Sequence, residues 1–364
     1  MIKKKILIAT GGTGGHVFPA YSLANFLQNN NYNVEVTTDL RGFRYLKHHK
    51  KIKIIKMPAS PLITNNVMKF LISLLTIFFS ISTSLFYLVF NRPSIIFGMG
   101  GYSSFPICIA ASILRIKFVI YENNLIIGKA NKYLLPFAKK IFVTFKEIEG
   151  INKNYNSKVL ELGNIIREEI INSKISNFEI NTFENPKILV LGGSQAARVF
   201  AEELPEIFKK LKDDMPQIKI YQQCQEEQKN HLSNFYQENN IDHEVFNFSD
   251  KIINYYSKAN LVITRSGASV LGELINIKVP FILIPFPFSA DNHQYKNAKF
   301  YEQRGYGYLL DQKNIKDKLF DLIKRIFNDK SLIKNILSKQ GQYSDKDIFR
   351  NLNIQLEKIL NEKN

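Results

Sequence analysis

The sequence has no tryptophan and only two cysteines among its 364 residues. Cys108 and Cys224 are far apart and form neither a C-x-x-C pair nor metal-ligand spacing, which excludes a disulfide framework and a cysteine-bound metal. We therefore expect two buried thiols in a reducing, cytoplasmic compartment. Low-complexity tracts and short-period repeats are also missing, and the first seven residues lack the small-residue cleavage site of a signal peptide.

Acidic residues are scarce beside basic ones: Asp and Glu total 32, Lys and Arg total 49, and the formal net charge is +17. Such a charge attracts anions, among them nucleotides, phosphorylated lipids and acidic membrane surfaces. A compositional bias of the source genome toward Lys, Asn and Ile explains the excess equally well, so both readings stay open. Apolar residues make up 45% of the chain, and its length predicts two domains with sizeable cores.

The longest apolar run, residues 70–90, contains no charged residue and is long enough to cross a bilayer. A crossing would place the strands before and after it on opposite sides of the membrane. We expect these strands to lie in one sheet, so a crossing is disfavoured. The apolar arc is wider than one sheet can cover, so we favour an interfacial helix that faces lipid. A buried core helix and a true span stay open. Its polar residues fall on one helix face: Asn66, Lys69, Ser73, Thr76, Ser80, Thr83, Tyr87 and Asn91.

Short apolar strands alternate with helical stretches, which predicts an α/β fold of two doubly wound, Rossmann-like domains. A polar stretch that ends at Asn185-Pro186 is typical of a linker. We expect one domain over residues 1–163 plus a C-terminal helix at 345–364, and a second domain over 164–344. The expected strands are residues 4–9, 33–37, 52–56, 94–97, 117–121, 140–143, 158–162, 187–191, 218–221, 244–246, 261–263, 281–284 and 307–310.

Three glycine-rich loops, residues 11–16, 98–102 and 192–198, each follow an expected strand and precede an expected helix, the first of which spans residues 17–28. Glycine lets the backbone approach an anion, and a helix N-terminus favours phosphate. The first loop matches a dinucleotide fingerprint poorly because Val17 stands where the third glycine belongs, which disfavours a dehydrogenase. The first two loops predict a diphosphate site formed by Gly11, Gly12, Gly100, Gly101 and Tyr102.

His16 ends the first glycine loop, where the positive end of a helix favours a neutral imidazole. We hypothesise that it is a general base, with a binding or structural role as the alternative. Glu122, in the turn formed by Tyr121-Glu122-Asn123-Asn124, is the rival base. Asp39 is interpreted as a turn residue.

Residues 264–294 hold the densest group of polar side chains. Arg265-Ser266-Gly267 leads from a strand into a helix that carries Glu273, whose carboxylate can accept both hydroxyls of a ribose; the alternative is a solvated charge at a helix start. Asp291, His293 and Gln294 follow. We expect no metal ion and no cofactor, because no metal-ligand spacing occurs near the loops.

In this order, the three glycine loops, Gly163-Asn164 with Arg167, and the segments 265–273 and 291–294 resemble the motifs of the MurG family. The resemblance covers essentially the whole chain. It implies a GT-B fold, in which two Rossmann-like domains face each other across a cleft and a final helix returns to the first domain. It also implies an inverting, metal-independent transfer of N-acetylglucosamine from UDP to the C4 hydroxyl of the N-acetylmuramyl sugar of lipid I, an undecaprenyl-diphosphate-linked acceptor.

The resemblance also implies roles for individual residues. The chain departs from the family at Tyr121 and Asn123, where His and Gln are usual, and at Val270, where a usual Thr would supply a phosphate donor. By position in the motifs, Thr13, Gly14, Gly15, Asn124, Arg167, Ser194 and Gln294 contact UDP-N-acetylglucosamine, Ala268, Ser269 and Glu273 hold the nucleotide, and the backbone of Ser249 contacts uracil.

The expected location is the cytoplasmic face of the bacterial inner membrane, as a peripheral protein on an anionic surface. Other cell-wall synthesis proteins are expected partners, and nucleic acid is not. Two alternatives stay open: a related transferase with another lipid acceptor, such as diacylglycerol, and a non-catalytic binder of lipid diphosphates. A non-catalytic binder would need only the glycine loops of the first half of the chain, whereas Glu273 and Gln294 in the second half are expected only if the protein binds a nucleotide sugar.

Overall fold

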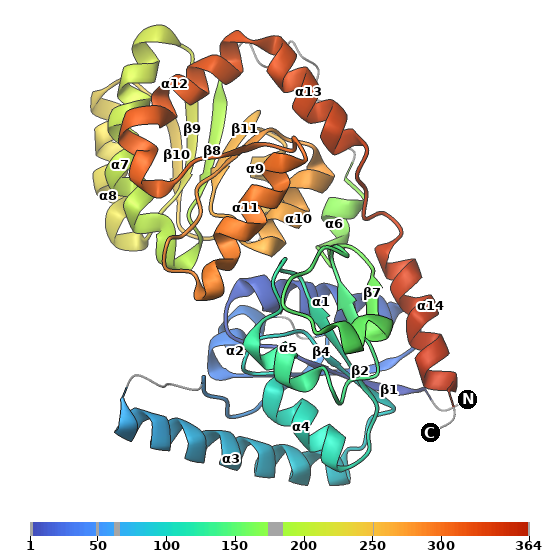
Figure 1. Cartoon of the computed structure of the whole chain (residues 1–364). Helices are drawn as coiled ribbons and strands as arrows, with labels where there is room; N and C mark the ends of the chain where they lie inside the picture. The colour runs from blue at the N-terminus through green and yellow to red at the C-terminus, as the bar shows by residue number, and fades with distance from the viewer. Residues whose placement is uncertain (1–2, 49–50, 62–65, 174–184, 250, 363–364) are drawn as a thin grey trace. The chain divides into compact units, whose positions relative to one another are not determined.

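The computed structural model describes residues 3–48, 51–61, 66–173, 185–249 and 251–362. The chain forms two compact units (Figure 1). Unit 1 comprises Met1–Glu168 together with Asp345–Asn364, and unit 2 comprises Glu169–Ser344. Each unit contains one parallel sheet, so the predicted α/β class is confirmed.

The sheet of unit 1 has the order β3-β2-β1-β4-β5-β6-β7. The order reverses between β1 and β4, and doubly wound sheets bind ligands at the carboxyl ends of the strands beside such a switch. Strands β4 and β5 are buried along their whole length, as helices on both faces require. The strands are β1 (Lys5–Ala9), β2 (Asn33–Thr38), β3 (Lys53–Lys56), β4 (Ile95–Gly98), β5 (Phe118–Glu122), β6 (Ile141–Val143) and β7 (Val159–Glu161).

The helices of unit 1 come from both ends of the chain. The last helix packs on the first, where the rings of Phe26 and Phe349 stack with their centroids 4.8 Å apart. The Lys117 ammonium donates to the Ile359 carbonyl at 3.2 Å and fixes the end of the same helix. The helices are α1 (Gly14–Asn29), α2 (Leu40–Leu46), α3 (Val67–Phe90), α4 (Phe105–Ile113), α5 (Lys129–Leu134), the 3-10 helix η1 (Lys153–Lys158), α6 (Glu168–Ile171), which begins at the unit boundary, and α14 (Ile348–Asn361).

Unit 2 repeats the same topology in the order β10-β9-β8-β11-β12-β13, with its switch between β8 and β11. Phe200 and Phe208 pack against Tyr236 and the apolar face of the sheet to form its core. Its strands are β8 (Lys187–Leu191), β9 (Lys219–Gln223), β10 (Asp242–Phe246), β11 (Leu261–Thr264), β12 (Phe281–Leu283) and β13 (Tyr308–Leu309). Its helices are α7 (Gly193–Asp214), α8 (Glu226–Glu238), α9 (Ile252–Tyr256), α10 (Ala268–Ile277), η3 (Ala290–Asn292), α11 (His293–Gln303), η4 (Gln312–Asn314), α12 (Ile315–Asn328) and α13 (Lys330–Gly341).

Every strand expected from the sequence is present, with ends shifted by at most two residues. The predicted start of the first helix at Val17 was wrong, because α1 begins at Gly14, inside the glycine loop. Glycine destabilises a helix most in its interior, and Gly14 and Gly15 are the first two residues of α1. The loop amides therefore belong to the helix N-terminus itself.

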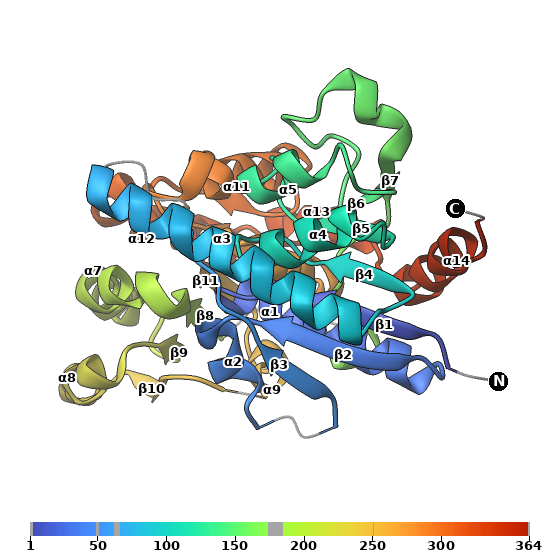
Figure 2. The same ribbon diagram turned by 90° about the horizontal axis from the view of Figure 1, so that it is seen from below.

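Helix α3 turns small polar side chains inward and apolar side chains outward. Figure 2 shows the helix lying alongside α4 at the surface of unit 1. Ser73, Ser80 and Ser84 are buried, and their hydroxyls donate to carbonyl oxygens of the preceding turn, so their burial leaves no donor unpaired. Helix α4 packs along α3. We define the apolar face of α3 as the exposed residues Val67, Met68, Leu71, Ile72, Leu74, Leu75, Phe78, Phe79, Phe86, Val89 and Phe90.

By length and composition, α3 is the one helix in the described part of the chain that could span a membrane. Only 22% of its apolar window is buried, which excludes a core helix. Strand β3 precedes it and β4 follows it, and both lie in the same parallel sheet. A span would separate these strands, so the topology argues against one.

A buried carboxylate, Glu35, links the C-terminal half of α3 to the sheet. Tyr87 of α3 donates a hydrogen bond to Glu35 of β2, and Lys5 and Lys53 form ion pairs with the same carboxylate at 2.9 Å each. Burial alone raises the pKa of Glu35, but the hydrogen bonds from Tyr87, Lys5 and Lys53 outweigh it and lower the pKa to about 2.

Candidate active site

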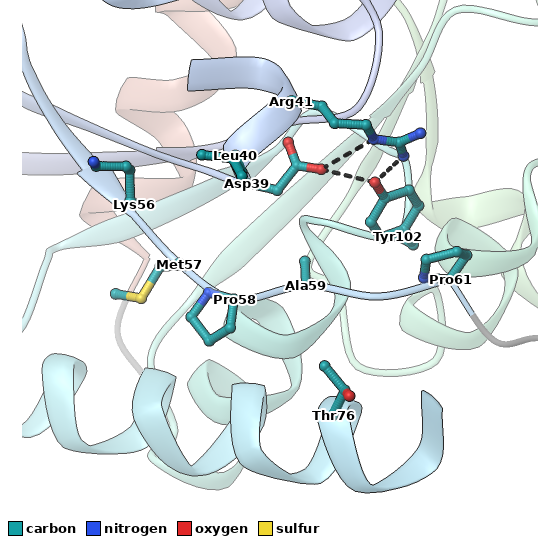
Figure 3. Close-up of a pocket in the computed structure, with 10 residues that line it drawn as sticks. All are labelled: Asp39, Leu40, Arg41, Lys56, Met57, Pro58, Ala59, Pro61, Thr76 and Tyr102. Carbon is teal, nitrogen blue, oxygen red and sulfur yellow. Dashed lines mark hydrogen bonds and ion pairs between the residues drawn. The ribbon is translucent and has the colours of Figure 1, made fainter. Parts of the chain in front are cut away.

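In unit 1, Asp39 joins the first two glycine loops (Figure 3). It caps α2 by accepting from the Gly42 amide at 2.8 Å, and the same oxygen accepts from the Gly12 amide at 2.9 Å. Its other oxygen accepts from the Tyr102 hydroxyl at 2.7 Å, and Arg41 donates to that hydroxyl. Asp39 is thus more than a turn residue. Because Gly12 donates its amide to Asp39, the amide is engaged within the protein.

His16 lies in the first turn of α1 and packs on the second glycine loop. Gly100 and Gly101 have φ values of +82° and +72°, and a Cβ atom on them would lie 3.3 Å and 3.5 Å from the imidazole. The left-handed backbone favours glycine at both positions, and at Gly100 the close approach of the ring adds a steric reason. The structure brings His16, Gly100 and Gly101 together, as the diphosphate hypothesis expects.

Glu122, at the end of β5, is buried and saturated with hydrogen bonds. One carboxylate oxygen accepts from the backbone and side-chain amides of Asn124 at 3.1 Å and 3.0 Å. The other accepts from the Gly128 amide at 2.9 Å and the Asn131 side chain at 3.0 Å. A carboxylate offers about four lone-pair sites, and all are used here.

Other predicted site residues of unit 1 lie around these loops. Asn123 donates to the Gly15 carbonyl at 3.3 Å, which connects the β5 turn to the start of α1. Thr13 is the N-cap residue of α1, followed by Gly14. The guanidinium of Arg167 lies over the Phe18 ring, 5.5 Å from its centroid, next to the same turn of α1.

Tyr121 has a structural role in place of the usual histidine. Its buried hydroxyl accepts from the Ile165 amide at 2.9 Å and donates to the Gly163 carbonyl at 3.1 Å. Burial raises the pKa of this hydroxyl. Asp345 holds the adjacent Asn164, accepting from its backbone and side-chain amides at 3.0 Å each.

In unit 2, Glu273 lies on α10 with only 7% of its surface exposed, which contradicts the alternative of a solvated helix-start charge. The Tyr256 hydroxyl of α9 donates to its carboxylate at 2.8 Å. Ala268 and Ser269 form the first turn of the same helix, where N–H groups have no intrahelical acceptor. A fixed carboxylate and a helix N-terminus are therefore presented by one element.

Arg265 directly follows β11 and is a buried cation. It donates to the carbonyls of Ile284 and Pro285 at 2.9 Å and 3.1 Å and to the Gln312 side chain at 2.7 Å. Its guanidinium lies 4.6 Å from the centroid of the Phe200 ring of α7. Burial lowers its pKa to about 10, so the charge persists at neutral pH.

The loop before α11 is locked to the β11 turn. The Ser266 hydroxyl donates to the Gln294 carbonyl at 2.8 Å, and the Gln294 side chain accepts from the Phe286 amide at 3.0 Å. Ser249 follows β10 and accepts from the Lys251 amide at 3.2 Å. Ser194 is in the first turn of α7, where only its backbone is described.

Sequence reasoning missed Asn131, Tyr256 and Asp345. Each acts through another residue, namely Glu122, Glu273 and Asn164. Nothing in the local sequence distinguishes them from ordinary helix and loop residues, because their partners lie on other elements, 9, 17 and 181 residues away along the chain. Within the described ranges, no group of three or more His, Cys, Asp or Glu is arranged to hold a metal ion.

The comparisons with known proteins cover both units. Residues 6–143 match the glycosyltransferase family 28 N-terminal domain and residues 187–352 its C-terminal domain. The chain is 33% identical over 365 residues to the "UDP-N-acetylglucosamine--N-acetylmuramyl-(pentapeptide) pyrophosphoryl-undecaprenol N-acetylglucosamine transferase" of Pelagibacter ubique, covering 99% of this chain and 100% of the relative. It is 36% identical to the protein of the same name in Rickettsia canadensis, over 93% and 96% of the two chains.

Among solved structures, MurG of Acinetobacter baumannii superposes with a TM-score of 0.76 at 23% identity, covering 98% of this chain and 99% of that one. A UDP complex of MnaA from S. aureus superposes with a TM-score of 0.69 at 14% identity, over 99% of both chains. These structural matches support the GT-B fold. On the matches to both family domains and the full-length relatives, the chain is a glycosyltransferase and belongs to the MurG family of N-acetylglucosamine transferases.

Proposed function

We propose that the chain transfers N-acetylglucosamine, with inversion, from UDP-N-acetylglucosamine to the C4 hydroxyl of the N-acetylmuramyl sugar of lipid I, giving lipid II for peptidoglycan synthesis. The observation that carries the proposal is the full-length similarity to the Pelagibacter ubique protein, whose name states this donor and acceptor. The buried carboxylate and helix N-termini of unit 2 support a nucleotide donor. The glycine loops of unit 1 support an anionic acceptor.

In this proposal unit 2 supplies the main donor contacts. The Glu273 carboxylate accepts hydrogen bonds from the ribose hydroxyls. The amides of Ala268 and Ser269 face the phosphates at the positive end of α10. Arg265 adds a permanent positive charge near the same turn, and this charge stabilises the negative charge that develops on the departing UDP. Contacts from Ser194, Ser249 and Gln294, and from Thr13, Gly14, Gly15, Asn124 and Arg167 of unit 1, stay predictions.

We assign His16 rather than Glu122 as the general base. A sugar hydroxyl is a poor nucleophile at neutral pH, so the acceptor needs a group that takes its proton. All the lone pairs of Glu122 are used by the turn it organises. His16 lies in the first turn of α1, and its ring packs on Gly100 and Gly101 of the second glycine loop, beside which the acceptor diphosphate would bind. In the diphosphate site predicted from Gly11, Gly12, Gly100, Gly101 and Tyr102, the Gly12 amide is already used by Asp39.

The apolar face of α3 supports attachment to a membrane surface. Leu75 and Phe78 have 69% and 71% of their surface exposed. So large an exposed apolar area is unfavourable in water and favours contact with lipid. Lysines at positions 47, 51, 53 and 56 and the net charge of +17 favour an anionic leaflet. A lipid-linked acceptor and a cytoplasmic nucleotide sugar together support a location on the cytoplasmic face of the inner membrane.

The test is sugar transfer from radiolabelled UDP-N-acetylglucosamine, measured in parallel with lipid I and with diacylglycerol. We expect a labelled product with lipid I only, and a lower rate of transfer to lipid I by a Glu273→Ala variant at donor concentrations near the wild-type KM. Label on diacylglycerol instead would assign the chain another acceptor. UDP binding without transfer to either lipid would make it a binder.

A further inference from the structure

Two adjoining cavities in unit 1 lie between α3 and the segment that follows β3. The first has a volume of about 540 Å³ and is bounded by Pro58, Thr76 and Tyr102 (Figure 3). The second has a volume of about 430 Å³ and is bounded by Thr83 and Phe90. Both are lined by Lys56 and Met57, so they adjoin at these residues, and we call the two cavities together the α3 groove. Ligand sites in proteins typically have volumes of roughly 300–1,000 Å³.

The α3 groove differs in chemistry between its two ends. Beside Thr83 its walls are apolar, and Phe86 and Phe90 connect it with the exposed apolar face of α3. At the other end stand Arg41 and Tyr102, and Tyr102 belongs to the second glycine loop. Lys56 lies between the ends with its ammonium 4.5 Å from the centroid of the Phe43 ring.

The charges at the glycine-loop end favour an anion. Asp39 lines the same end, but its carboxylate accepts from Gly12, Gly42 and Tyr102, and Arg41 lies 3.6 Å from it. Arg41 and Lys56 together outnumber this one carboxylate. An occupant with an apolar body and an anionic end therefore matches the groove in both halves.

We propose that the α3 groove holds the first isoprene units of a polyprenyl-diphosphate acceptor and leads them from the lipid surface to the glycine loops. This rests on the proposed function. From Thr76 to Asn91 the helix that walls the groove rises roughly 22 Å, which accommodates several isoprene units in an extended chain. A single chain whose diphosphate ends at Tyr102 fits this path, whereas a phospholipid carries two chains on a single phosphate.

The test is filling the groove and comparing acceptors of different chain length in detergent. The variant is Thr83→Trp, which places a large ring in the second cavity without altering the loop after β3. Its matched control is Ser82→Trp, the exposed neighbouring position on α3. The acceptors carry the same sugar, peptide and diphosphate on either an undecaprenyl chain or a single prenyl unit.

We expect Thr83→Trp to raise the KM for the undecaprenyl acceptor by about tenfold or more, because several buried CH₂ groups lose their apolar contacts. The KM values for the single-prenyl acceptor and for UDP-N-acetylglucosamine should not change, and Ser82→Trp should resemble the wild type with both acceptors. If Thr83→Trp proves unstable, Thr83→Phe, which places a smaller ring in the same second cavity, should repeat the effect.

Three results would overturn the groove assignment and leave the transferase proposal intact. One is an unchanged KM for the undecaprenyl acceptor in both groove variants. Another is an equal rise for both acceptors, which would point to the sugar or peptide as the occupant. The third is an effect seen only when phospholipid is added, which would make the groove a phospholipid site. Loss of transfer by the wild type to every acceptor would instead contradict the proposed function.

Discussion

At the scale of single residues, the carboxylates near the strand ends are held in place by named partners. Asp39 ties two glycine loops, Glu122 organises the turn after β5, and Glu273 is fixed by Tyr256. A carboxylate that already has a hydrogen-bonding partner and little freedom loses less entropy when a ligand binds. The partners are therefore as testable as the carboxylates.

Glu273→Ala should weaken UDP binding by about 1–3 kcal/mol, because hydrogen bonds from the ribose hydroxyls to a charged group are lost. Calorimetry with UDP measures this. Tyr256→Phe should weaken binding less, since the carboxylate stays but loses its positioning hydrogen bond. Equal UDP affinities in the wild type and Glu273→Ala would remove Glu273 from the donor site.

His16→Ala should lower kcat by roughly 10²–10⁴-fold while UDP affinity stays nearly unchanged. The acidic limb of the pH–rate profile should disappear with the imidazole. Glu122→Gln serves as the comparison: its amide would face the donors of Gly128 and Asn131, so it should lower the free energy of unfolding by about 1–3 kcal/mol and keep the acidic limb. An acidic limb that persists in His16→Ala and vanishes in Glu122→Gln would reverse the assignment.

At the scale of elements, α3 combines an exposed apolar face with a fixed inner face. Leu75→Asp together with Phe79→Asp should release the protein from anionic vesicles, because both positions are more than 60% exposed and the fold does not need them. Cosedimentation measures the release, and circular dichroism checks the fold. Ile354→Asp on α14, exposed at 44%, is the control and should still cosediment. Full, salt-insensitive binding by the double variant would revive the span.

Glu35 makes the attachment of α3 dependent on pH. Its folded pKa of about 2 lies below the ordinary value of 4.5, so the unfolded state binds more protons between these values. The stabilisation is complete above about pH 4.5 and is lost as the pH falls toward 2. Urea titrations at pH 7 and pH 3 measure the free energy of unfolding. Glu35→Gln should lower it by about 1–3 kcal/mol at pH 7 and by less at pH 3. The exposed Glu238→Gln should match the wild type at both pH values.

At the scale of the whole molecule, the sequence predicts the strands well because each is a short apolar run bounded by polar residues. It also predicts the exposed apolar helix, since no sheet covers so wide an arc. It does not predict which polar residues of α3 are buried, because Ser73 and Ser80 satisfy their hydroxyls within the helix itself. Links such as Tyr256 to Glu273 are equally hidden, because they join distant segments.

Unit 1 is built from both ends of the chain, so its stability depends on α14. Phe349, which stacks on Phe26, is 6% exposed, and Phe349→Ala should cost about 3–5 kcal/mol of unfolding free energy. Denaturant titration measures it. Ile354→Ala on the outer side of the same helix should change it by about 0.5 kcal/mol or less. Equal effects of the two variants would show that α14 contributes no packing.

Helix α3 exposes its apolar side chains and buries polar ones, which has a consequence for the purified protein. In water, the exposed phenylalanines and leucines of α3 are hydrated. Contact with another copy or with a micelle removes this apolar surface from water and is therefore favourable. Self-association observed without an amphiphile therefore reports on this one helix and not on a functional assembly. The oligomeric state of the enzyme is a question to ask in bilayers or detergent, where the helix has its natural solvent.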